Sequence, residues 1–154
     1  MSFKFEKLEV WQMALDYIDL IYEMADRLPE NEKFNLKSQI TRAATSVALN
    51  IAEGSTGQTD PEQNRFLGLA LRSLLETVAC QRIIKRRKYL LDDPTLDKID
   101  TEANLLATKI QSFRKSLGKS GYATREDIAS YEFDIAENQS SIVRGLWSSL
   151  FEPY

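Results

Sequence analysis

Apolar residues recur at three- and four-residue steps along four long segments, and this spacing is typical of one face of an α-helix. The first segment predicts a helix over about residues 8–28, which Pro29 ends. The second predicts a helix over about 35–53, and Gly54 suits the left-handed position just past its end. The apolar seams of these two helices consist of Trp11, Ala14, Ile18, Ile21, Ala25 and Leu28, and of Leu36, Ile40, Ala43, Val47 and Ile51.

A third helix is predicted after the turn at 55–59, with Asp60 as its N-cap and Pro61 in its first turn. It extends to about residue 91. Leu69 and Ile83 fall outside its seam, and apolar residues on several sides of one helix indicate self-association. That seam is a second, weaker one, which consists of Phe66, Ala70, Ser73, Thr77, Cys80 and Ile84.

The fourth helix, over about 94–117, opens on the pair Asp93-Pro94 and stops at Gly118. Its seam is the most regular of the four: Leu96, Ile99, Ala103, Leu106, Ile110, Phe113 and Leu117. Short connections between long helices favour antiparallel neighbours. The chain is therefore expected to be all-α, with residues 1–118 forming an antiparallel up-down-up-down four-helix bundle.

Residues 119–154 are expected to form a separate acidic and amphipathic extension that is also helical. A short helix over about 125–137 is followed by an apolar face that requires a covering surface. The bundle itself, a neighbouring subunit or a separate protein that binds an amphipathic helix could supply that surface. The candidate partner-binding residues are Ile142, Leu146, Trp147, Leu150 and Phe151.

Composition narrows the possible functions of this 154-residue chain. It contains no histidine and a single cysteine, Cys80, which excludes an intrachain disulfide and many forms of metal-dependent or acid–base catalysis. No apolar stretch approaches the roughly 20 residues that span a bilayer, and the N-terminus lacks a signal-peptide pattern. A cytoplasmic protein without catalytic residues, metal, cofactor or membrane contact is expected.

Charge is unevenly distributed, although the net charge is only −3. Residues 120–154 contain six acids and two bases. In one run near the end of the third predicted helix, by contrast, every charged residue is basic. We refer to this run as the basic cluster: Arg82, Lys85, Arg86, Arg87 and Lys88. Such clusters attract phosphate backbones through counterion release, which predicts contact with RNA or DNA.

Two other interpretations of the basic cluster remain open. Acids follow it directly along the chain, so the cluster could instead be an ordinary solvated helix end. The acidic first half of the extension could also cover it and weaken nucleic-acid binding. Tyr89, beside the cluster, could stack on a base or pack against the end of the bundle.

A polar stripe borders the seam of the second helix, because about 100° per residue brings its members into a narrow arc. Together with two residues of the third helix it includes Gln39, Arg42, Ser46, Asn50, Glu53, Gly54, Ser73 and Glu76. Either an inter-helix hydrogen-bond network or a ligand-binding surface would explain these residues. Glu53, at a helix C-terminus, is expected to need a basic partner such as Arg65 or Arg72.

The run from Gln39 to Gly54, with segments 8–14 and 66–76, resembles the signature of the 23S ribosomal RNA intervening-sequence proteins. Arg72 stands where that family usually has glycine. The resemblance implies a left-handed antiparallel bundle that assembles into a ring, commonly a pentamer, without established enzymatic activity. A related bundle serves diversity-generating retroelements by binding a reverse transcriptase and its RNA.

The expected function is therefore a non-enzymatic, ring-forming module that associates with RNA or another nucleic acid through the basic cluster. The alternative is an oligomeric scaffold that recruits a protein partner, such as a reverse transcriptase, through its C-terminal extension.

Overall fold

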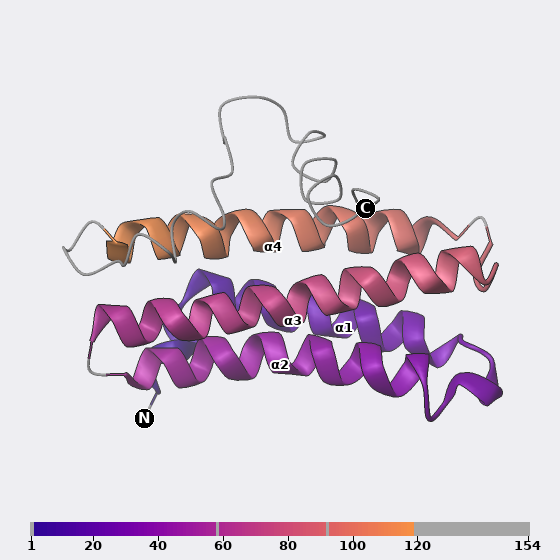
Figure 1. The fold of residues 1–154 in the computed structure, drawn as a ribbon, viewed down its shortest axis with the longest axis horizontal. Helices are drawn as coiled ribbons and strands as arrows, with labels where there is room; N and C mark the ends of the chain where they lie inside the picture. The colour runs from indigo at the N-terminus through magenta and orange to yellow at the C-terminus, as the bar shows by residue number, and fades with distance from the viewer. Residues whose placement is uncertain (1, 58, 92, 119–154) are drawn as a thin grey trace, which may run out of the picture. The chain divides into compact units, whose positions relative to one another are not determined.

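The computed structural model describes residues 2–57, 59–91 and 93–118, and within them the chain forms a bundle of four α-helices. Each helix packs against the next in sequence, and the first also packs against the last, as in an up-down-up-down bundle (Figure 1). The predicted all-α four-helix bundle is confirmed. The helices are α1 (Glu9–Asp26), α2 (Leu36–Thr56), α3 (Asp60–Arg86) and α4 (Pro94–Gly118).

The predicted seams of α2 and α4 form the core as expected. Leu36, Ile40, Ala43, Val47 and Ile51 of α2 are all buried. The seam of α4 is buried from Leu96 to Ile110, and Phe113 and Leu117 pack against the core from its edge. Burying one such aliphatic side chain contributes about 1.5–3 kcal/mol, so these two faces hold much of the fold's stability.

The buried face of α1 differs from the predicted seam. Trp11 and Ile18 are only half-buried, whereas Tyr17 and Met24 are inaccessible to solvent. The difference arises because a tyrosine can enter a core when its hydroxyl finds partners. The Tyr17 hydroxyl lies 2.7 Å from Thr77 Oγ1 and accepts a hydrogen bond from Gln81 Nε2 at 3.1 Å.

Gly54 lies inside α2 and not beyond its end, which corrects the predicted boundary. The helix continues to Thr56, where the Gly57 N–H donates to the Gly54 carbonyl oxygen at 3.2 Å. A Cβ atom at Gly54 would lie 2.7 Å from Cβ of Phe66 on α3. The glycine is therefore needed for close packing of α2 against α3, and not for a left-handed backbone.

The third helix ends at Arg86, about five residues earlier than predicted. The backbone is left-handed at Lys88, with φ 60°. The Tyr89 N–H donates to the Ile84 carbonyl oxygen, and the Lys88 N–H donates to the Lys85 carbonyl oxygen, each at 3.1 Å. This pattern is the Schellman motif that terminates helices. Glycine usually occupies the left-handed position, so a lysine there gave no stop signal in the sequence.

The other helix ends show one wrong and one correct cap prediction. Thr59, not Asp60, is the N-cap of α3, and its side chain accepts a hydrogen bond from the Glu62 N–H at 3.4 Å. At α4 the predicted aspartate is confirmed, because Asp93 Oδ1 accepts from the Thr95 N–H at 2.9 Å. Two short 3-10 turns that the seams did not predict are η1 (Lys4–Lys7) and η2 (Glu30–Glu32).

Cys80 lies on the inner face of α3 and is buried. Burial raises the pKa of its thiol, and the nearby Glu76 carboxylate raises it further. The described part of the chain has no helix both long and apolar enough to cross a membrane. The predicted boundary between residues 1–118 and 119–154 stays a prediction, because residues 119–154 lie outside those that the structure describes.

Candidate nucleic-acid interface

The basic cluster lies at the C-terminal end of α3 and on the first residues after it. Lys85, Arg86, Arg87 and Lys88 all have exposed side chains. Among the described residues, none of these four forms an ion pair with a carboxylate. Four neighbouring positive charges therefore face solvent without a direct ion pair in the described part of the bundle, although the Arg87 charge interacts with the Glu32 carboxylate at longer range.

Arg82, the fifth predicted member, is placed differently. Its Nη1 atom donates to Asp100 Oδ2 of α4 at 2.7 Å, and both side chains are only partly exposed. This contact lies between α3 and α4, one turn before the exposed residues. Arg82 therefore joins two helices, and the surface available to a ligand begins at Lys85.

Two connections meet at this end of the bundle: the one between α1 and α2, and the one between α3 and α4 (Figure 1). The Tyr89 hydroxyl donates to Glu32 Oε1 at 3.0 Å, and Arg27 forms an ion pair with Asp93. We refer to these two contacts as the end clasp. Tyr89 is half-buried within it, so the predicted packing role of this tyrosine agrees with its position.

The Glu32 carboxylate is buried yet well supplied with donors. Its Oε2 atom accepts from Asn35 Nδ2 at 3.0 Å and from the Leu36 N–H at 3.4 Å, in addition to the Tyr89 contact. Burial alone would raise the pKa of Glu32, but hydrogen bonds from Tyr89, Leu36 and Asn35 hold it below its ordinary value. The carboxylate is thus charged and directed inward.

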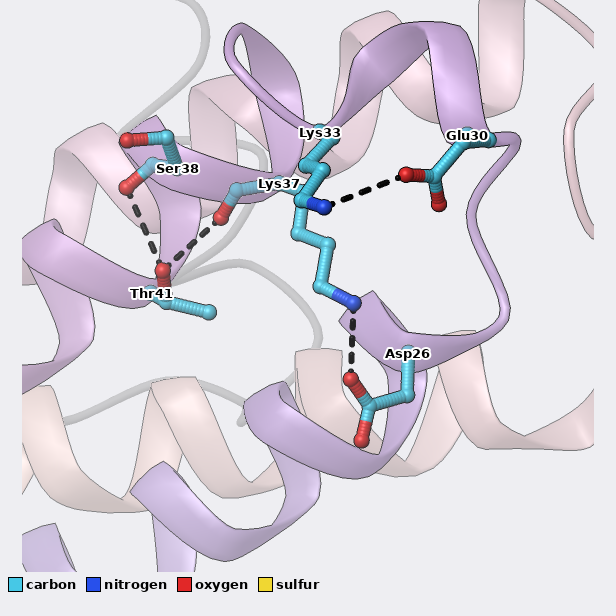
Figure 2. Close-up of polar contacts among 6 residues, drawn as sticks. All are labelled: Asp26, Glu30, Lys33, Lys37, Ser38 and Thr41. Atoms are coloured by element: carbon cyan, nitrogen blue, oxygen red, sulfur yellow. Dashed lines mark hydrogen bonds and ion pairs between the residues drawn. The ribbon is translucent and has the colours of Figure 1, made fainter.

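Other acids of this end are also engaged within the chain. Figure 2 shows Lys37 Nζ on Asp26 Oδ1 at 2.8 Å and Lys33 Nζ on Glu30 Oε1 at 3.3 Å. The pKa of Asp93 is lowered by the Thr95 N–H and, less strongly, by Arg27. These carboxylates are therefore paired with bases other than those at the end of α3.

An exposed phenylalanine at this end is a candidate that no sequence pattern singled out. The side chain of Phe34, between η2 and α2, is 90% exposed, and Lys33 Nζ lies 5.6 Å from its ring centroid. A lone phenylalanine in a polar loop, outside every apolar seam, is the signal that could have identified it.

The polar stripe behaves mainly as an inter-helix network. Ser46 Oγ of α2 lies 2.9 Å from Ser73 Oγ of α3, and Asn50 Nδ2 donates to Ser46 Oγ at 3.1 Å. The Gln39 side chain donates to Asn35 Oδ1, at the start of its own helix, at 3.2 Å. In the described residues Glu53 forms no ion pair with Arg65 or Arg72, so that predicted pairing is wrong. The charged members of the stripe, Arg42, Glu53 and Glu76, have exposed side chains.

Two further predicted features concern metals and the C-terminal extension. No cluster of three or more metal-binding side chains occurs in the part of the chain that the structure describes. The predicted partner-binding residues Ile142, Leu146, Trp147, Leu150 and Phe151 lie outside the described residues.

Comparison with known families agrees with this architecture. The family model for the 23S rRNA-intervening sequence protein matches residues 6–112, from η1 to the last turns of α4. The chain belongs to this family. The match extends over the whole α2–α3 contact and over the basic cluster. No curated protein matches the chain in sequence.

Proposed function

We propose that this 23S rRNA-intervening sequence protein is a non-enzymatic, self-associating bundle that binds RNA or another nucleic acid through the exposed end of α3. The observation that carries the proposal is the group of four exposed bases, Lys85 to Lys88, none of which forms a direct ion pair among the described residues. Phosphate binding by such a group releases counterions and is independent of sequence.

The geometry of the helix end supports this function more than a role in stability. Bases in the last turn of a helix gain only about 0.3–1 kcal/mol from the helix dipole when exposed. Lys88 also occupies a left-handed backbone conformation, which is unfavourable for a side chain with a Cβ atom. A helix end optimised for stability alone would place glycine there, so helix termination does not explain the lysine.

The test is anisotropy titration of a labelled RNA with the Arg86→Glu/Arg87→Glu variant of the full chain. Wild-type affinity should fall steeply between about 50 and 200 mM salt, and the variant should bind more weakly with a salt slope lower by about 2. The matched control is Lys4→Glu/Lys7→Glu in η1, at the end of α1 away from the basic cluster. It changes the net charge by the same amount as the Arg86/Arg87 variant. Equal affinities for wild type and the Arg86/Arg87 variant would refute the assignment.

Self-association is the second part of the proposal. It is supported by exposed apolar side chains on two packed helices: Leu49 of α2 is 59% exposed and Ile83 of α3 is 48% exposed. A ring, with five subunits as the family resemblance implies, would bury such residues. Light scattering at micromolar concentration should give a mass several times that of the chain, and Leu49→Asp or Ile83→Asp should lower it. A monomeric wild type would contradict this part.

A further inference from the structure

Phe34 is exposed to a degree that packing does not explain. Single exposed apolar residues are common on protein surfaces. This one, however, is an aromatic ring 90% exposed, in a connection whose backbone is held firmly by the Glu32 hydrogen bonds. A preorganised apolar contact surface loses little conformational entropy on binding.

The end clasp joins the segment that carries Phe34 to the segment that follows the basic cluster. Phe34 lies two residues from Glu32, whose Oε1 atom receives the Tyr89 hydroxyl at 3.0 Å. Arg87, in turn, has its Cζ atom 5.8 Å from the centroid of the Tyr89 ring. The contacts of Glu32 with Tyr89 and of Tyr89 with Arg87 therefore bring the connection that carries Phe34 to the same end of the bundle as the basic cluster, although the two segments are more than fifty residues apart in sequence.

Tyr89 is poorly suited to bind a base itself, because its hydroxyl and ring are both occupied. The hydroxyl donates to Glu32, and the Arg87 guanidinium lies over the ring. Phe34 has no polar atom to satisfy and contacts only the ammonium of Lys33 among the described aromatic and cationic pairs. The ring presented to a ligand at this end is therefore that of Phe34.

We propose that Phe34 stacks on an unpaired base while Lys85, Arg86, Arg87 and Lys88 contact the flanking phosphates, so that this end binds single-stranded in preference to duplex nucleic acid. The inference rests on the proposed function and adds to it the kind of nucleic acid bound. A base in a duplex is already stacked on both faces, whereas an unpaired base offers a free π-face. Phosphate contacts alone would not distinguish the two forms.

The proposal is tested by anisotropy titration of the full chain with two probes of equal length, a labelled single-stranded uridine-rich RNA and an RNA duplex. Phe34→Ala and Phe34→Leu should weaken single-strand binding by about 5- to 150-fold, the range expected for one lost base–aromatic stack. Duplex binding should be unchanged. Phe34→Trp keeps a stacking surface and should retain single-strand binding. Phe34→Leu keeps an apolar side chain without an aromatic ring, so it separates the effect of stacking from that of hydrophobicity.

The outcomes distinguish this inference from the proposed function. If Arg86→Glu/Arg87→Glu weakens binding of both probes while Phe34→Ala binds the single strand like wild type, the inference is wrong and the proposed function stands. If neither probe binds wild type in a salt-sensitive manner, both are wrong. If Phe34→Ala lowers the mass measured by light scattering, the ring belongs to a subunit contact and the inference is overturned.

Discussion

One missing methyl group determines how closely α2 approaches α3 at Gly54. A Cβ atom there would lie 2.7 Å from Phe66 Cβ, a contact that neither helix can relieve without moving its backbone. Gly54→Ala is therefore expected to destabilise the fold by about 1–3 kcal/mol, despite the better helix propensity of alanine. Chemical denaturation monitored by circular dichroism measures the difference.

Gly68 offers a matched control on α3. A Cβ atom at this position would lie 3.4 Å from the nearest atom of the Arg114 guanidinium, which is an ordinary van der Waals contact. Gly68→Ala should therefore raise stability by about 0.5–1 kcal/mol through helix propensity. A similar loss of stability for both substitutions would show that glycine at position 54 is not required for close packing.

Lys88 gives a second prediction at the scale of one residue, because its backbone is left-handed with φ 60°. Lys88→Gly removes the steric cost of a Cβ atom in that conformation and should stabilise the fold by about 1 kcal/mol. Lys85→Gly is the control: the same substitution inside α3 should destabilise by a similar amount. Thermal unfolding of both variants tests the Schellman motif, and a loss of stability on Lys88→Gly would contradict it.

At the scale of elements, α1 and α3 are joined by a buried hydrogen-bond network around Tyr17. Removing its hydroxyl leaves Gln81 Nε2 without its acceptor, and Gln81 Oε1 already lacks a partner among the described residues. Tyr17→Phe is therefore expected to cost about 1–3 kcal/mol. Denaturant titration of Tyr22→Phe, whose exposed hydroxyl lies 3.3 Å from Thr45, should show a change within about 0.5 kcal/mol. Equal effects of the two substitutions would mean that the network does not stabilise the bundle.

The same network marks the limit of prediction from sequence for the elements. Hydrophobic spacing correctly predicted four helices, their antiparallel order and the buried faces of α2 and α4. It missed Tyr17, because a seam chosen for apolar residues passes over a tyrosine whose partners lie sixty residues away. It also missed Met24, because the seam took the neighbouring Ala25 and both are buried. It also placed the end of α3 too late, since a left-handed lysine resembles any helical lysine in sequence.

At the scale of the whole bundle, the end clasp makes stability depend on pH. The folded-state pKa of Glu32 lies below its ordinary value of 4.5, so its carboxylate stabilises the fold fully above that pH. The contribution is lost as pH falls through the lowered pKa. Wild type should thus lose more stability on acidification than Glu32→Gln, as urea titrations at successive pH values would measure.

Glu30→Gln is the control for this prediction, because Glu30 is exposed and pairs only with Lys33 among the described residues. It should follow the wild-type dependence on pH. If Glu32→Gln also follows wild type, the carboxylate of Glu32 does not hold the two connections together.

Of the candidate interface, the basic cluster could be predicted from the sequence, whereas Phe34 could not. Four of the five residues in the basic cluster are exposed as a run of bases suggests, but Arg82 is held by Asp100, a partner that only the packing of α3 on α4 reveals. The sequence did not show that the connection carrying Phe34 lies at the same end of the bundle as the cluster and is joined to Tyr89. That arrangement depends on the Tyr89–Glu32 contact between two connections, and no local pattern encodes such a contact.

The buried thiol of Cys80 provides a way to measure transient opening of the bundle. It is the chain's sole cysteine, so a thiol-reactive dye can modify the protein at one position only. Since the reagent needs an accessible thiolate, the rate of modification in native buffer reports how often the inner side of α3 becomes exposed. Cys80 is therefore an intrinsic probe of local opening. The modification rates of the variants discussed above can be compared without an engineered label.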